Sequence, residues 1–163
     1  GVPSQEDVLA LALAAEELAR EVYRRAVAAR PFRGPWAAYL EAALAQEEEH
    51  ARRLREALGR QPALRFRLPE VFQSPILLLR LLESLEEAFV GAYLGALPLL
   101  EGEALRLAGA ILGVEAGHRV LVRQARLELQ DPLLRPPFVA NDRALEQALS
   151  PEGAREALKP YLP

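Results

Sequence analysis

The chain of 163 residues contains no cysteine and no methionine, and it has only two histidines and one tryptophan. The absence of cysteine excludes disulfide bonds, thiolate metal sites and thiol nucleophiles. It leaves the redox compartment of the protein open. Because methionine is also absent at the start, we expect a processed or a trimmed form of a longer chain.

Lysine and long uncharged runs are scarce as well. Lys159 is the only lysine, and the net charge is −3 without a polybasic patch, so we expect no nucleic-acid partner. The longest uncharged run has 13 residues, Ala88 to Leu100, whereas a membrane span needs about 20. We therefore expect no membrane span. The 51% of hydrophobic and 26% of charged residues are typical of one globular domain with its own core.

Hydrophobic spacing and start and stop signals predict four long helices. The first begins after Ser4, with Asp7 as its partner in a capping box, and runs towards Pro31. Glycine and proline mark the ends of the other three, which are expected over about 35–59, 75–98 and 101–129.

The connections predict how these helices are arranged. Short links join the first helix to the second and the third to the fourth, so each pair is expected to be an antiparallel hairpin. Residues 60–74 can extend over about 50 Å, which exceeds the length of about 36 Å of a 24-residue helix. This segment can therefore cross the full height of a bundle. The sequence predicts an all-α fold, a ferritin-like four-helix bundle over residues 1–129 with one long crossover.

A C-terminal arm is expected over residues 130–163. Short helices are predicted over about 142–149 and 151–159, the second because Ser150, Pro151 and Glu152 form a helix-start signal. The apolar residues of the arm, Leu133, Leu134, Phe138 and Val139, predict that it packs on the bundle.

The stretch AQEEEHARRL, residues 45–54, places three consecutive glutamates before His50. Residues three, four or seven positions apart share a helix face. By this spacing Glu47 lies with His50 on an apolar face that includes Leu40 and Leu54, whereas Glu49 faces arginines and solvent. We therefore expect Glu47 and His50 to point into the core.

The same spacing selects one inward glutamate in each of the other predicted helices. Glu115 lies on an apolar face with Ile111, three residues before His118. Glu16 and Glu86 lie on the apolar faces of the first and third helices. Both histidines of the chain thus follow an inward glutamate by three residues, each in the second helix of a hairpin.

An approximate repeat relates the two hairpins. Glu16 precedes Tyr23 by seven residues, as Glu86 precedes Tyr93, and the two inward glutamates of each hairpin are 31 and 29 residues apart. This spacing predicts a pseudo-twofold axis on which the carboxylates and imidazoles converge. Glu83 lies half on the inner face, and we expect it beside this site.

Four buried carboxylates need a counter-charge, because without one they would cost many kcal/mol or stay protonated. The arginines lie mostly on outer faces, so two divalent metal ions are the expected counter-charge. One Glu from each of two helices and a Glu-x-x-His motif from each of the other two is the ligand set of di-iron and di-manganese bundles. We therefore predict two iron or manganese ions per chain, with the ligands Glu16, Glu47, His50, Glu86, Glu115 and His118.

The chain resembles the exported, desiccation-associated branch of the ferritin-like proteins. The matching stretches are LAAEELAREVY, AQEEEHARRLREALG, LEEAFVGAYLGA, ILGVEAGHRVLVR and LSPEGAREALKPYL. The resemblance implies that Glu47 and Glu115 bridge the metals, that Glu16 and Glu86 are terminal ligands, and that each metal takes one histidine. It also implies Tyr23 and Tyr93 as hydrogen-bond donors to those carboxylates. It further implies export to the periplasm or the cell exterior, although no twin-arginine signal is present in this sequence.

The function expected from these features is ferroxidase or peroxide-consuming chemistry, with dioxygen or peroxide as partner, in stress protection. The ligand types do not choose between iron and manganese. Two other classes of function stay open at this point. The protein can be a non-catalytic ferritin-like protein whose site is structural, vestigial or a metal-free polar network, or it can be a subunit of an iron-storage cage.

Two rows of glycine are not explained by the metal site. They are Gly91 and Gly95 in the third predicted helix and Gly109, Gly113 and Gly117 in the fourth. Interior glycine costs about 1 kcal/mol against alanine, and both rows lie away from the inward glutamates. We interpret them as a seam of close approach for the C-terminal arm or for a second subunit of a homo-oligomer. The alternative is ordinary tight packing between the two helices.

Overall fold

A computed structural model describes residues 1–163, which form helices, turns and irregular segments without a β-strand. The long helices are α1 (Gln5–Ala29), α2 (Pro35–Leu58), α3 (Pro75–Ala96) and α4 (Gly102–Glu128). The short elements are α5 (Pro151–Leu158) and the 3-10 helices η1 (Leu97–Leu99) and η2 (Lys159–Tyr161). The prediction of an all-α fold with four long helices is confirmed. No helix combines the length and the apolar composition that a membrane span requires.

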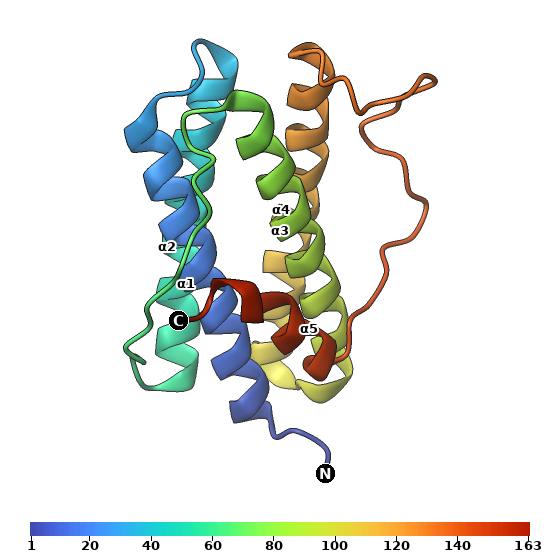
Figure 1. Cartoon of the computed structure of the whole chain (residues 1–163). Helices are drawn as coiled ribbons and strands as arrows, with labels where there is room; N and C mark the ends of the chain where they lie inside the picture. Colours follow the sequence, from blue (N-terminus) through green and yellow to red (C-terminus); the bar gives the residue numbers. More distant parts are fainter.

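Figure 1 shows two helical hairpins joined by one long crossover. α1 packs against α2, and α3 packs against α4. The segment 60–74 runs in extended form from the lower end of α2 to the upper end of α3, so that α2 and α3 run in the same direction (Figure 1). This is the connectivity that the length of the segment predicted.

The helix ends follow local chemistry. Ser4 caps α1, because its hydroxyl accepts from the backbone N–H of Asp7 while the Asp7 carboxylate accepts from the backbone N–H of Ser4. Pro35 and Pro75 occupy the first turns of α2 and α3, where a missing N–H costs nothing. Gly59 ends α2 with a φ of 79°, a left-handed conformation that favours glycine.

The apolar core is divided into two clusters. The larger contains 18 buried residues, among them Leu18 and Leu82, and the smaller contains 10, among them Leu13 and Ile111. Along each long helix an inward glutamate lies between residues of one cluster and residues of the other. The division of the core therefore leaves a polar layer in the middle of the bundle.

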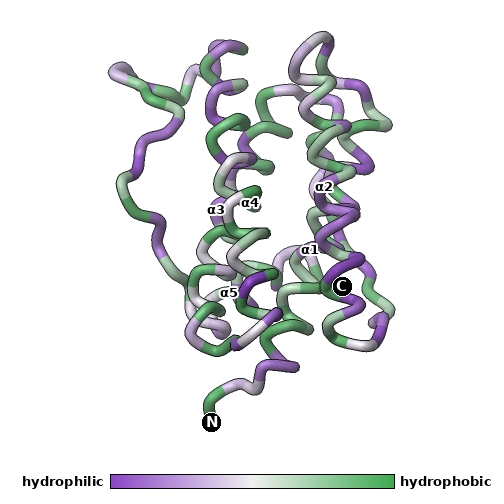
Figure 2. Tube along the Cα trace, turned by 180° about the vertical axis from the view of Figure 1, so that it is seen from behind, coloured by the Kyte–Doolittle hydropathy of each residue, from purple (hydrophilic) through white to green (hydrophobic).

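α3 is more apolar than α2 (Figure 2), and the C-terminal part of the chain explains the difference. α5 lies across α1 and α3 near one end of the bundle (Figure 1). The backbone N–H of Leu149 donates to the carbonyl of Gly91 at 2.8 Å. α3 thus has a second covered face, whereas α2 has an outer face of charged residues.

The prediction of a helix over 142–149 is wrong, since this part of the arm is irregular. Leu149 uses its backbone to bind α3, and Arg143 pairs with Glu87 of α3, so the segment lies extended. Of the four apolar residues expected to pack on the bundle, Leu133 and Val139 do not, because they are 60% and 61% exposed. Leu134 and Phe138 are half-buried, and the guanidinium of Arg123 in α4 lies 4.8 Å from the centre of the Phe138 ring.

Ion pairs attach the first part of the arm to the bundle. Asp131 is buried and accepts hydrogen bonds from Arg80 of α3 and Arg126 of α4, with the shortest contacts at 2.6 and 2.8 Å. Further along the arm, Asp142 accepts from Arg119 of α4 at 3.0 Å. The arm is therefore fixed to α3 and α4 by charge.

The prediction that glycines allow the C-terminal arm to approach closely is confirmed for the row in α3, Gly91 and Gly95. A Cβ atom on Gly91 would lie 2.9 Å from Cγ of Leu149, and one on Gly95 would overlap the Leu149 carbonyl. Gly109, Gly113 and Gly117 are exposed, and a Cβ there would meet no atom within 4 Å. The arm does not cover this second row, and its role in a homo-oligomer stays a prediction.

Candidate metal centre

One glutamate from each long helix points into the polar layer between the two apolar clusters. These glutamates are Glu16 of α1, Glu47 of α2, Glu86 of α3 and Glu115 of α4, each at most 1% exposed. The two histidines lie beside them, with His50 of α2 at 8% exposure and His118 of α4 at 3%. All six residues that the sequence singled out as ligands are therefore close together and buried.

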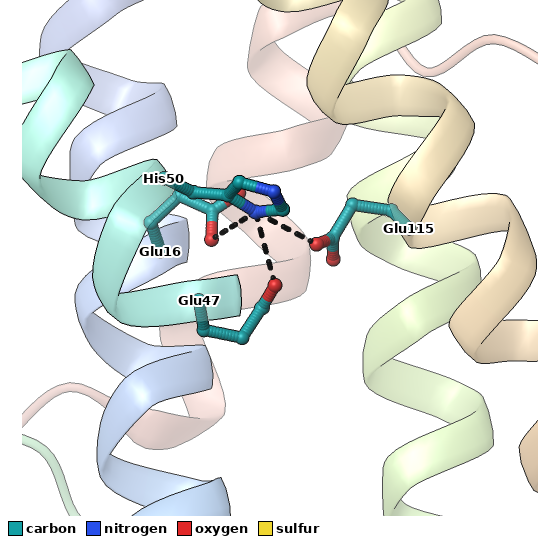
Figure 3. A group of neighbouring side chains, drawn as sticks. All are labelled: Glu16, Glu47, His50 and Glu115. Carbon is teal, nitrogen blue, oxygen red and sulfur yellow. Dashed lines mark ion pairs between the residues drawn. The ribbon is translucent and has the colours of Figure 1, made fainter. Parts of the chain in front are cut away.

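His50 is at the centre of one group, which Figure 3 shows. Its Nδ1 atom lies 3.1 Å from Oε1 of Glu47 and 3.2 Å from Oε1 of Glu115. Oε2 of Glu16 lies 3.4 Å from the same nitrogen. Three carboxylates from three helices thus surround one imidazole nitrogen.

His118 is at the centre of a second group. Its Nδ1 atom lies 3.3 Å from Oε1 of Glu86 and 3.7 Å from Oε1 of both Glu47 and Glu115. Both groups have the composition of a metal site, three carboxylates and one histidine. Because Glu47 and Glu115 belong to both groups, the arrangement is one centre with two adjacent positions.

Most of the buried polar atoms of this centre lack hydrogen-bond partners. Nine buried side-chain nitrogen or oxygen atoms in the protein have none, and eight of them belong to these six residues. An unpaired buried polar atom costs about 1–3 kcal/mol. Two atoms bound to one ion at about 2.1 Å each lie no more than about 4.2 Å apart, and the six distances above satisfy this limit. The residues therefore fit two divalent ions held by oxygen and nitrogen.

Burial makes the centre resist negative charge. It raises the pKa of Glu16 and of Glu115 to about 7 and the pKa of Glu86 to about 8, from an ordinary value of 4.5. Burial and the charge of Glu115 also raise the pKa of Glu47 well above its ordinary value. Without a metal ion the four glutamates thus ionise at a much higher pH than exposed glutamates do, and they are only partly ionised near neutral pH.

The two histidines differ in protonation. Burial opposes the charged form of His50, but the carboxylates of Glu115 and Glu16 close to Nδ1 outweigh it and raise the pKa of His50 to about 10. Burial lowers the pKa of His118. His50 can thus act as a partial counter-charge in the metal-free protein. His118 stays neutral, which is the form that binds a metal.

Tyr23 and Tyr93 each donate a hydrogen bond to a glutamate of the centre that belongs to the other hairpin. The hydroxyl of Tyr23 in α1 donates to Glu86 of α3 at 2.9 Å, and the hydroxyl of Tyr93 in α3 donates to Glu16 of α1 at 2.7 Å. Burial raises the pKa of both phenols well above the ordinary value, so both remain donors. Each tyrosine therefore orients a glutamate of the other hairpin.

Sequence reasoning missed two residues that contact the centre. The hydroxyl of Tyr39 lies 2.6 Å from that of Tyr23, and Oε1 of Gln46 lies 2.6 Å from Nε2 of His118. A proton on Nε2 satisfies this contact and leaves the Nδ1 lone pair of His118 free for a metal ion. Gln46 directly precedes Glu47 on an exposed part of α2, so helical spacing did not select it.

Glu83 does not lie beside the centre as we expected. Its carboxylate accepts from Arg123 at 3.1 Å and from Arg126 at 2.8 Å, both in α4. One arginine, Arg119, is only 2% exposed, in contrast to the outer positions expected for arginine, and its guanidinium pairs with Asp142. The charge of Arg119 is therefore matched by the arm, and Arg119 forms no ion pair with the four glutamates.

The comparison with known families agrees with this geometry. Residues 4–128 match the family described as the ferritin-like domain. The match includes the four long helices and all six residues of the centre. No curated protein matches the chain. Since the match extends over more than half of the chain, the protein belongs to the ferritin-like domain family.

Proposed function

We propose that the protein binds two divalent ions, iron or manganese, at this centre. Glu16 and His50 would hold one ion and Glu86 and His118 the other, and both ions would share Glu47 and Glu115. The observation that supports the proposal is the set of eight buried, unpartnered oxygen and nitrogen atoms on these six residues. Two such groups, each of three carboxylates and one histidine, lie side by side and share two members.

Charge supports the same assignment. Four carboxylates carry the charge that two divalent ions neutralise, and the metal ions would displace the protons that burial favours. Tyr23 donates to Oε1 of Glu86 and Tyr93 donates to Oε1 of Glu16, so these carboxylates are oriented before an ion arrives. The apolar clusters on both sides of the layer exclude bulk water from the site.

We propose further that the centre reduces dioxygen or peroxide, as a ferroxidase or a peroxide-consuming enzyme. Bound iron or manganese would supply the electrons for this reaction. The protein contributes a buried ligand set whose six side chains stand on four regular helices. The stretches that resemble the exported, desiccation-associated branch support a role in stress protection outside the cytoplasm.

Metal analysis tests the proposal. The wild-type protein, reconstituted anaerobically with Fe(II) or Mn(II), is expected to retain two ions per chain by elemental analysis. The double variant His50→Ala/His118→Ala is expected to lose them. Glu49→Gln is the matched control, because Glu49 neighbours His50 on α2 but pairs with Arg52 at the surface. A wild-type protein without bound metal would make the cluster a polar network and would refute the proposal.

The oligomeric state separates this proposal from the iron-storage alternative. A storage cage is a closed shell of many subunits, which light scattering distinguishes from a monomer or a small oligomer. Oxygen or peroxide consumption by the reconstituted protein, measured in the same preparation, distinguishes a redox centre from a structural metal site. A metal-loaded protein that consumes neither would support the non-catalytic alternative.

A further inference from the structure

A small apolar cavity of about 30 Å³ lies beneath α5, where α5 crosses α1 and α3. Figure 1 shows this crossing near the lower end of the bundle. Fourteen residues line the cavity, and thirteen of them are hydrophobic. Several are alanines, which come from all three helices: Ala12, Ala15, Ala88, Ala92, Ala96, Ala154 and Ala157. Because an alanine side chain ends at Cβ, the three helices leave space between them.

The cavity lies next to the candidate metal centre. Tyr93 is one of the residues that line the cavity, and its hydroxyl donates to Glu16 at 2.7 Å. Ala12 and Phe89, which also line the cavity, stand one helical turn from Glu16 and from Glu86. Tyr93 thus belongs both to the lining of the cavity and to the residues that contact a carboxylate of the centre.

The lining determines what the cavity can hold. One water needs about 10–15 Å³ and two to four polar partners. The volume suffices, but the lining is almost entirely apolar. Apolar protein cavities stay dry and bind apolar guests such as xenon. The occupant expected here is a small, uncharged molecule without hydrogen-bonding groups.

We propose that this cavity is a binding site for dioxygen beside the metal centre. The assignment rests on the proposed function, and it specifies the substrate of that centre. Dioxygen is apolar and has two atoms, so it suits both the volume and the lining. Hydrogen peroxide both donates and accepts hydrogen bonds, and it would leave them unpaired in this cavity.

The surroundings of Tyr23 differ from those of Tyr93. Tyr23 occupies the repeat position that corresponds to Tyr93, but its hydroxyl lies 2.6 Å from that of Tyr39. The rings of Tyr23 and Tyr39 lie edge to face with their centroids 6.0 Å apart. An aromatic side chain therefore packs against Tyr23, whereas Tyr93 lies among the alanines that line the cavity. The two otherwise similar hairpins thus differ in what surrounds the corresponding tyrosine.

Xenon binding to the metal-free protein tests the cavity without any redox activity. In the wild type we expect saturable xenon binding by NMR, with shifts confined to the residues around Tyr93 and Phe89. Ala92→Val narrows the cavity from α3 and is expected to abolish xenon binding. Ala12→Val narrows the cavity from α1 and is expected to have the same effect. Ala42→Val is the matched control, since Ala42 is exposed on α2, and it should bind xenon as the wild type does. Absence of xenon from the wild type, or full binding in both cavity variants, would overturn the proposal.

Oxygen kinetics then test the role of the cavity. In protein loaded with Fe(II), Ala92→Val is expected to slow the reaction with dioxygen at limiting concentration, with unchanged metal content and an unchanged rate with hydrogen peroxide. An unchanged rate with dioxygen would overturn the proposal even if xenon binds. A wild type without bound metal would refute the proposed function and with it the role of the cavity. A failure of xenon binding alone would refute only the cavity.

Discussion

Raising the pH is predicted to destabilise the metal-free protein, and Glu86 provides the clearest contribution. Burial raises the pKa of this carboxyl from 4.5 to about 8. In the unfolded chain it ionises near its ordinary value, whereas in the folded protein it keeps its proton up to about pH 8. Between these two pKa values the folded state binds more protons than the unfolded state. The contribution of Glu86 to stability is therefore complete below the pKa of the unfolded chain and is lost as the pH rises towards about 8. Between about pH 5 and about pH 7.5, a range of about 2.5 pH units at about 1.36 kcal/mol each, the free energy of unfolding should fall by about 3 kcal/mol.

The assay is urea denaturation of chelator-treated protein at these two pH values. Glu86→Gln keeps the shape of the side chain but does not titrate, so its stability should fall by about 3 kcal/mol less than that of the wild type. Glu48→Gln, at an exposed position of α2, should keep the wild-type pH dependence. Mn(II) should stabilise the wild type more at the higher pH, because the ion replaces protons.

Two outcomes would contradict the predicted pH dependence. A wild-type protein whose stability is constant or rises over this interval would show that burial does not control the protonation of the cluster. A Glu86→Gln variant with the same pH dependence as the wild type would show that this carboxyl does not contribute. Either result would remove the electrostatic argument for a metal counter-charge.

Three further predictions concern the residues around the centre and the arm. Tyr23→Phe removes a hydroxyl donor from a proposed ligand and should weaken metal binding about tenfold, measured by competition with a chelating dye. Asp131→Asn should lower the free energy of unfolding by about 2–4 kcal/mol in urea denaturation, because two arginines lose a buried partner. Gly95→Ala should cost about 1–3 kcal/mol in the same assay, because its Cβ would overlap the carbonyl of Leu149 and force the arm away from α3.

A matched glycine variant tests whether the contact with the arm is the reason for the effect of Gly95→Ala. Gly113→Ala adds the same methyl group at an exposed position of α4 with free space around it, so it should stabilise the protein by up to about 1 kcal/mol. Equal effects of the two glycine variants would contradict the contact between the arm and α3. Unchanged metal affinity in Tyr23→Phe, or unchanged stability in Asp131→Asn, would contradict the corresponding contact.

The positions of the six cluster residues could be predicted from the sequence because each stands on a regular helix. Helical spacing alone places Glu47 and His50 on one face, and the length of the segment 60–74 determines how the two hairpins are joined. Gln46 could not be found in this way, because its long side chain reaches His118 from outside the apolar face. Glu83 stands on a border of the inner face, where spacing alone cannot decide between the cluster and the arginines of α4.

The arm could not be predicted in the same detail, because no periodic pattern determines an irregular segment. Its apolar residues suggested packing on the bundle, yet Leu133 and Val139 remain exposed. Asp131 and Asp142 carry the attachment, and their arginine partners on α3 and α4 lie 5 to 51 positions away in the sequence. Charged residues at such separations can be paired only after the helices have been placed in space.

The attachment of the arm and the chemistry of the centre are connected through α3. Tyr93 contacts Glu16 and lines the cavity beneath α5, and Gly95, two residues later, allows the backbone of Leu149 to approach. Leu149 lies two residues before the start of α5, so the close approach at α3 determines where α5 begins. α5 in turn contributes Ala154 and Leu158 to the lining of the cavity. The side of the centre that we propose for dioxygen therefore depends on a segment outside the four-helix bundle, although every proposed metal ligand lies within it.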